Sequence, residues 1–145
     1  MTGRHLTIDG WATGPDGKVD SEVQRLLDDR DHLAAVLDDL VALVGMQILK
    51  PAELLAVPLD ATRVDGDEDC GGSTGVVVLT TSHASLHTWP LRGQVSFDLY
   101  SCREFDTDAA LGFLADRLRL TGGTVRSLPR FFDPKHRHGF VCDVQ

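Results

Sequence analysis

A serine, a histidine and a cysteine lie close together in the middle of the chain, at Ser82, His87 and Cys102. A hydroxyl, an imidazole and a thiol are groups that proteins use for nucleophilic attack and proton transfer. Tight turns between short strands would bring the three together. Composition also allows a simpler interpretation, in which the serine and the histidine are polar residues on a strand face and the cysteine is a small buried hydrophobic residue.

The stretch that carries these residues has the pattern of three strands. Residues 76–79 form an apolar, mostly β-branched run, which ends at polar residues 80–83 and is followed by a second run that contains His87. After a turn at residues 90–93, apolar and polar residues alternate from 94 to 100, which is the period of a half-buried strand. Cys102 follows this third strand directly.

These residues resemble a known motif. The sequence SHASLHTWP at residues 82–90, preceded by the glycine-led strand from Gly75 and followed by Cys102, resembles the core motif of the small prokaryotic S-adenosylmethionine decarboxylases. The opening of the chain, GRHL at residues 3–6, is similar to the N-terminal strand of that family. The resemblance is close over residues 75–102, brief at 3–6, and elsewhere limited to the order of the elements.

The resemblance implies that the chain makes its own cofactor. The Ser82 hydroxyl would attack the Thr81 carbonyl, and the resulting ester would be eliminated, so that the chain is cut between Thr81 and Ser82 and the new terminus becomes a pyruvoyl group. His87 matches the family histidine credited with this processing, and Thr74 occupies the position of a family serine whose hydroxyl assists. No cofactor beyond the group derived from Ser82, and no metal, is implied.

Decarboxylation is the activity that the resemblance implies. The pyruvoyl carbonyl would form a Schiff base with a substrate amine and act as an electron sink while carbon dioxide leaves. Cys102 matches the family's proton donor, and a thiol suits this task because its pKa, about 8.5 when unperturbed, can be tuned toward neutrality. The expected role is in polyamine biosynthesis.

Two positions depart from the family and bear on the substrate. The residue before the processing serine is usually glutamate and here is Thr81, and the glutamate that grips the ribose hydroxyls is replaced by Leu91. Losing that charged acceptor should cost about 1.5 to 3 kcal/mol of binding. S-adenosylmethionine remains the default substrate, L-ornithine or L-arginine is the alternative, and Asp98 or Glu104 could replace the lost contacts.

Two other classes of protein compete with the interpretation as a decarboxylase. Thr81 beside the scissile bond favours a non-processing pseudoenzyme that regulates a true decarboxylase. A hydrolase that uses Cys102 and a histidine is a weaker alternative, because it explains neither Ser82 nor the break between the strands.

Composition limits the class further. The 145 residues suit one domain, residues 1–145, with 42% hydrophobic and 25% charged residues. A net charge of −8 disfavours nucleic acid as a partner and fits a cationic substrate.

No run reaches the roughly 20 apolar residues of a membrane span, and the N-terminus lacks a signal peptide's apolar core, so we expect a cytoplasmic protein without membrane contact. Three widely spaced cysteines indicate a reduced compartment.

The remaining elements follow from periodicity and turn residues. We expect a strand in residues 4–9, a helix from 21 to about 45, an edge strand within 46–59, a loop over 60–74, a helix from about 107 stopped by glycines at 122–123, a final strand at 124–128, and a tail from 129 whose HRH sequence at 136–138 lies in a surface loop. The acidic face of the first helix is expected to be solvated rather than a metal site.

An α+β fold follows from this order. Short connections in the middle require antiparallel pairing, and two helices can cover one face of the sheet, which gives a two-layer sandwich. The other face would remain free for a second subunit. Because the resembling enzymes are dimers with active sites near the interface, we expect a homodimer, or a heterotetramer of two cleaved protomers, that acts on a small amine.

Overall fold

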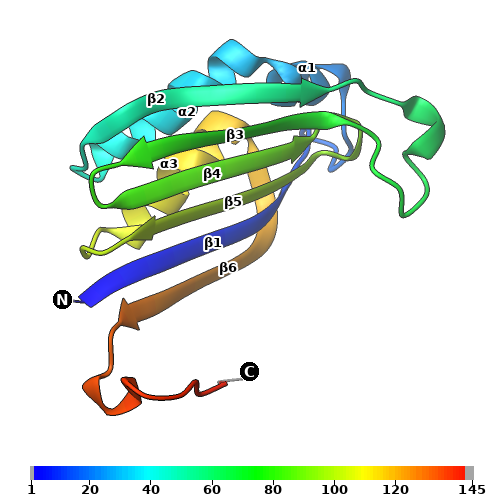
Figure 1. Ribbon diagram of the computed structural model, residues 1–145. Helices are drawn as coiled ribbons and strands as arrows, with labels where there is room; N and C mark the ends of the chain where they lie inside the picture. The colour runs from blue at the N-terminus through cyan, green and yellow to red at the C-terminus, as the bar shows by residue number, and fades with distance from the viewer. Residues whose placement is uncertain (1, 143–145) are drawn as a thin grey trace.

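The computed structural model describes residues 2–142 and consists of one antiparallel sheet with helices on one face (Figure 1). Its elements are β1 (Thr2–Ala12), α1 (Ser21–Asp28), α2 (Arg30–Leu43), β2 (Ile48–Val57), β3 (Gly72–Leu79), β4 (Ser82–Trp89), β5 (Gln94–Ser101), α3 (Thr107–Leu118) and β6 (Leu120–Phe131). The strand order is β2-β3-β4-β5-β1-β6, and every neighbouring pair is antiparallel. The predicted fold class, an α+β two-layer sandwich with a mainly antiparallel sheet, is confirmed.

The core lies between the sheet and the helices. Alternate residues of the central strands point into it, because side chains along a strand alternate between the two faces. The fully buried large side chains come from both layers: Leu6, Leu27, Leu33, Leu37, Leu40, Leu86, Leu99, Leu114 and Leu118, with Val23, Val36 and Val41. The opposite face, which we call the open face, has no helix over it in the described part of the chain (Figure 1).

The helix predicted from residue 21 to about 45 is two helices, so three helices cover the sheet rather than two. Asp29 breaks the run, since its backbone is extended, its N–H caps α1 by donating to the Leu26 carbonyl, and its carboxylate caps α2 by accepting from the His32 N–H at 3.1 Å. A short polar side chain favours a cap over a helix interior. Hydrophobic periodicity continues through the break and therefore hid it.

The last strand is longer than predicted at both ends. α3 ends at Arg119 in a left-handed conformation, not at the glycine pair, and β6 starts one residue later. β6 then pairs with β1 from Ala12↔Leu120 to Thr2↔Phe131, so it includes the residues at 122–123 and 129–131. A side chain at Gly123, where φ is +150°, would meet the Asp9 carbonyl oxygen at 2.3 Å, so glycine is required there by the neighbouring strand.

β2 is the edge strand predicted within residues 46–59, with register shifts on either side of Lys50. β3 begins at Gly72, inside the stretch predicted to be loop. Beyond β6, residues 132–142 form a tail that leaves the edge of the sheet and contains a short turn at Pro134–His136 (η3) (Figure 1). The side chains at 136–138 are exposed, as predicted. No helix in the described part of the chain is long and apolar enough to cross a membrane.

Candidate active site

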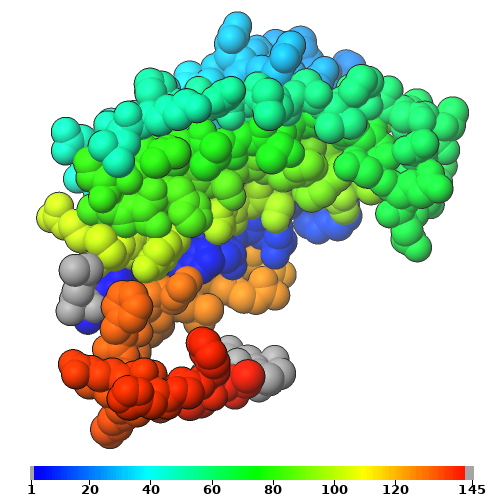
Figure 2. Space-filling view, in the orientation of Figure 1, coloured from blue at the N-terminus to red at the C-terminus, as the bar shows by residue number. Residues whose placement is uncertain are grey.

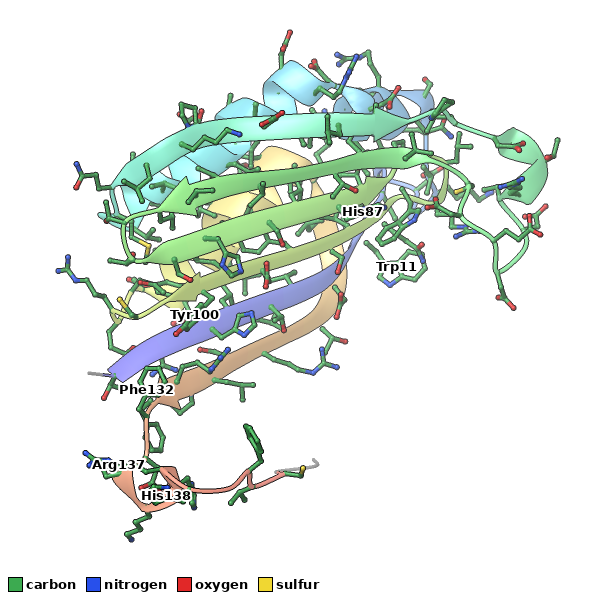
Figure 3. The ribbon with its side chains drawn as sticks, in the orientation of Figure 1. Trp11, His87, Tyr100, Phe132, Arg137 and His138 are labelled. Carbon is green, nitrogen blue, oxygen red and sulfur yellow. The ribbon has the colours of Figure 1, made fainter. Side chains whose placement is uncertain are left out.

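The predicted site residues lie at two separate ends of the sheet. One end is formed by the start of β4 and the end of β5, and the other by the start of β3 and the end of β4 (Figure 3). Between them the open face presents alternate residues of β4, β5 and β1: His83, Ser85, His87, Trp89, Gln94, Ser96, Asp98, Tyr100, His5, Thr7, Asp9 and Trp11.

The first end brings Thr81, Ser82 and Cys102 together. Ser82 opens β4 opposite Ser101, and the backbone N–H of Cys102 donates to the Thr81 carbonyl oxygen at 3.0 Å. Ser82 has φ of +154°, one of two positive values among the non-glycine residues of the described chain. Its Oγ lies 3.3 Å from His83 Nδ1. The peptide predicted to be cut is therefore held between two strands at a residue with an uncommon backbone conformation.

This geometry suits attack on the Thr81 carbonyl. The Cys102 N–H already points at the oxygen that would gain negative charge, and fixed backbone donors of this kind stabilise oxyanions. Sequence reasoning considered only the Cys102 thiol. Because every residue type except proline has a backbone N–H, no sequence pattern signals such a donor.

The second end joins Thr74 and His87. These residues face each other across β3 and β4, and the Thr74 hydroxyl and His87 Nδ1 share a short hydrogen bond. The His87 ring lies 4.0 Å, centroid to centroid, from the Trp89 ring, and its Nε2 is buried with no hydrogen-bond partner among the described residues. Burial lowers the pKa of His87 from its ordinary value, while attraction to the Asp69 carboxylate partly opposes this. A neutral imidazole can accept a proton.

The two ends are too far apart to form one site within a single chain. Ser82 and His87 lie five residues apart on the same strand, which separates them by roughly 16 Å. The turns therefore bring the backbones of Thr81–Ser82 and Cys102 together, whereas His87 lies away from both, contrary to the expectation for the imidazole. The sequence spacing could not show this, since it does not state which residues continue one strand.

A charged network fills the open face between the ends. Asp98 accepts hydrogen bonds from the Ser85 hydroxyl and from His5 Nε2, the latter at 3.0 Å. Arg130 lies 4.6 Å above the Tyr100 ring and 3.2 Å from His5 Nδ1. A hollow of about 440 Å³ adjoins this network and reaches His87 at its other side. A face with this many polar groups suits contact with a partner or a polar ligand.

The residues considered for substrate binding are distributed over both ends. Leu91 lies in the turn Pro90–Arg92 (η2), four residues after His87 on the chain. Arg92 fixes the loop between β2 and β3 to this turn by donating to the backbone carbonyls of residues 63, 64, 66 and 68. Glu104 is exposed and paired with Arg4 at 2.6 Å, and Asp98 belongs to the central network.

Gly3 packs against Cys102 and gives a test of the first end. A Cβ at this position would lie 2.2 Å from the Ser101 carbonyl oxygen and 2.8 Å from Cys102 Cα, so β1 and the end of β5 would have to separate. We expect Gly3→Ala to lower the free energy of unfolding by about 1 to 3 kcal/mol and to slow any reaction at Thr81–Ser82.

Gly112→Ala is the matched control, because this glycine is exposed on α3 and nothing lies within 4 Å of the added Cβ. It should stabilise the chain by about 0.5 to 1 kcal/mol. Chemical denaturation measures both variants, and equal stability of the two would show that the contact of Gly3 with Cys102 is not tight.

Comparison with known proteins shows which fold and which family the chain shares. It is similar to the crystal structure of the adenosylmethionine decarboxylase from Aquifex aeolicus, with a TM-score of 0.59 and 21% identity over 99% of this chain and 95% of that one, a likeness of fold. The model of the S-adenosylmethionine decarboxylase family matches residues 19–131. The chain belongs to this family.

Individual relatives match over shorter stretches of the chain. The S-adenosylmethionine decarboxylase proenzyme of Thermoplasma acidophilum is 43% identical over 60 residues, which are 41% of this chain and 46% of that one. The proenzyme of a Geobacillus species is 36% identical over 63 residues, or 43% and 51% of the two chains. The chain thus spans about half the length of the curated relatives it matches.

Proposed function

We propose that the chain is a self-processing, pyruvoyl-dependent decarboxylase of a small amine in polyamine biosynthesis. The observation that carries the proposal is the Thr81–Ser82 peptide, whose carbonyl accepts a hydrogen bond from the Cys102 N–H and whose serine has a positive φ. The names of the relatives support it, because a proenzyme is a precursor that must be processed.

The processing step follows from the positions of these groups. The Ser82 Oγ attacks the Thr81 carbonyl carbon, the Cys102 N–H stabilises the negative oxygen, and the peptide C–N bond breaks to leave an ester. Removal of the Ser82 α-proton then breaks the Cβ–Oγ bond and releases Thr81 as a carboxylate. Hydrolysis of the new terminus takes up water, releases ammonia and leaves a ketone.

The residues at the first end fit the product of this step. The resulting pyruvoyl group would supply the electron sink for decarboxylation. Cys102, adjacent in the structure to the Thr81 carbonyl, carries a free thiol that can donate a proton to the substrate carbon. Gly3 and Tyr100 line a small hollow of about 70 Å³ beside this thiol.

The second end acts, in this proposal, on another copy of the chain. Suppose that the open faces of two copies face each other and are related by a half-turn about an axis that lies between them, perpendicular to the strands. Thr74 and His87 of one protomer would then lie opposite Ser82 of its partner. The separation of roughly 16 Å within one chain supports this arrangement, because a base must lie within hydrogen-bond reach of the proton it removes. The homodimer would then hold two shared sites, and its cleaved form would be a heterotetramer.

S-adenosylmethionine is the first substrate to consider. Leu91 is the position that bears most directly on whether the site can bind its ribose. In the half-turn dimer Leu91, which follows His87, lies on the partner's side of the site. Its side chain cannot accept hydrogen bonds from a ribose. L-ornithine and L-arginine, which need no such acceptor, are the alternative substrates.

Leu91→Glu tests this assignment of specificity. A carboxylate at the turn should raise kcat/KM for S-adenosylmethionine by about 10- to 100-fold, since hydrogen bonds to charged groups contribute about 1.5 to 3 kcal/mol. Leu91→Gln is the matched control of similar size without charge and should gain less. Steady-state decarboxylation with the three amines measures the effect, and an unchanged preference in Leu91→Glu would place the specificity elsewhere.

A further inference from the structure

The tail at residues 132–142 exposes apolar side chains that contact little of its own chain. Phe132 is 91% exposed and Phe140 fully so, and Val141 lies beside it, 67% exposed. The side-chain hydrogen bonds and ion pairs found within the described tail join tail residues to one another, as where the Asp133 carboxylate accepts from the Lys135 N–H. In Figure 2 the tail stands away from the rest of the molecule below β6.

A receiving surface lies at the opposite end of the open face. Trp11, 51% exposed, and Trp89 border a hollow of about 220 Å³ whose floor includes Gly10. Both tryptophans sit beside Gln94 in the strand register, whereas the tail leaves β6 where Phe131 pairs with Thr2. Figure 3 shows this separation, with Trp11 at one end and Phe132 at the other. A single chain therefore leaves both apolar surfaces uncovered.

Charge differs between the two ends in a complementary way. The tail presents Lys135 and Arg137, while Asp133 is its one acidic residue among those described. The loop between β2 and β3, at the end of the sheet that carries the tryptophans, presents acidic residues: Asp60, Asp65, Asp67, Glu68 and Asp69, with Arg63 as the one base. Opposite charges at opposite ends favour pairing of two copies end to end, twice in a two-fold dimer.

We propose that the tail of one protomer packs over the Trp11–Trp89 surface of a second copy of the chain. The proposal rests on the dimer described under the proposed function and assigns its C-terminal contact. The half-turn that brings His87 of one copy to Ser82 of the other also exchanges the two ends of the sheet, so it carries the tail of each copy to the tryptophan end of its partner. The catalytic geometry thus brings the tail of one copy and the tryptophans of the other to the same end of the dimer.

The dimer dissociation constant of the purified full chain tests the proposal, measured by sedimentation equilibrium. Deleting residues 132–145, or replacing both Phe132 and Phe140 by serine, should raise this constant at least about tenfold, because buried aromatic anchors dominate interface energies. Trp11→Ser should raise it to a similar degree. The tail deletion combined with Trp11→Ser should raise the dissociation constant little more than either change alone, since both changes remove the same contact.

Leu43→Ser is the matched control, because Leu43 is also 51% exposed but lies on α2, on the other side of the sheet. It should leave the constant unchanged. Tail variants that dimerise as tightly as the full chain, or tail and Trp11 effects that simply add, would overturn the proposal. Chain cleavage, read separately by mass, distinguishes its failure from failure of the pyruvoyl chemistry, because a processed monomer would contradict only the dimer and its tail contact.

Discussion

Replacing Ser82 by alanine is expected to leave the chain uncut and without decarboxylase activity. Alanine has no oxygen to attack the Thr81 carbonyl, so neither the ester nor the pyruvoyl group can form. The hydrogen bond from the Cys102 N–H to the Thr81 carbonyl needs no side chain and should survive the change. Denaturing mass analysis and a carbon dioxide release assay measure the two losses.

Two further variants show whether the loss of cleavage is specific to the Ser82 hydroxyl. Thr80→Ala removes an exposed hydroxyl from the same turn and should still be cut. Cys102→Ala keeps the backbone donor but lacks the thiol, so it should be cut while turnover falls by about 10²- to 10⁴-fold, the usual value of a positioned proton donor. Full activity of Ser82→Ala, together with loss of activity in Cys102→Ala, would instead indicate a cysteine-dependent hydrolase.

Mixing two inactive variants is expected to restore cleavage. His87→Ala should be processed about 10²- to 10⁴-fold more slowly than the original chain, because it lacks the proposed base. Ser82→Ala has no nucleophile but keeps Thr74 and His87 in place. In a mixed dimer, Ser82 of the first variant meets His87 of the second, so one of the two shared sites is complete.

The yield of this experiment follows from statistics. When equal amounts of the two variants exchange subunits freely, about half of the His87→Ala chains lie in mixed dimers. These chains should be cut at the normal rate. A Ser82→Ala chain that also carries His87→Ala is the control and should rescue nothing. If mixing leaves the rate at that of His87→Ala alone, the residues act within one chain and the half-turn dimer is wrong.

The strands of the sheet and the fold class were predictable because their signals are local. The alternation over residues 94–100 is reproduced by β5, and the apolar runs flanking Ser82 became β3 and β4. The break at Asp29 was not predictable from periodicity, since apolar residues keep the same spacing on both sides of it. The glycines at 122–123 suggested a helix stop, but both lie in β6, where the close approach of β1 requires glycine at Gly123.

The sequence predicts the residue types of the candidate site but not their arrangement. Ser82, Thr81 and Cys102 meet because antiparallel neighbours place the start of β4 beside the end of β5. His87 continues the same strand as Ser82 and is therefore carried away from it. The Cys102 N–H has no sequence signature, and the contribution proposed for a partner depends on a surface that only the folded sheet defines.

A denaturing intact mass of the purified chain tests the central claim most directly. The account predicts two masses, for residues 1–81 with a free carboxylate and for residues 82–145 lighter by one ammonia than a peptide that begins with serine. A single mass for the uncut chain of 145 residues, unchanged on prolonged incubation of the dimer, would contradict it. That result would favour the regulatory pseudoenzyme that Thr81 suggested.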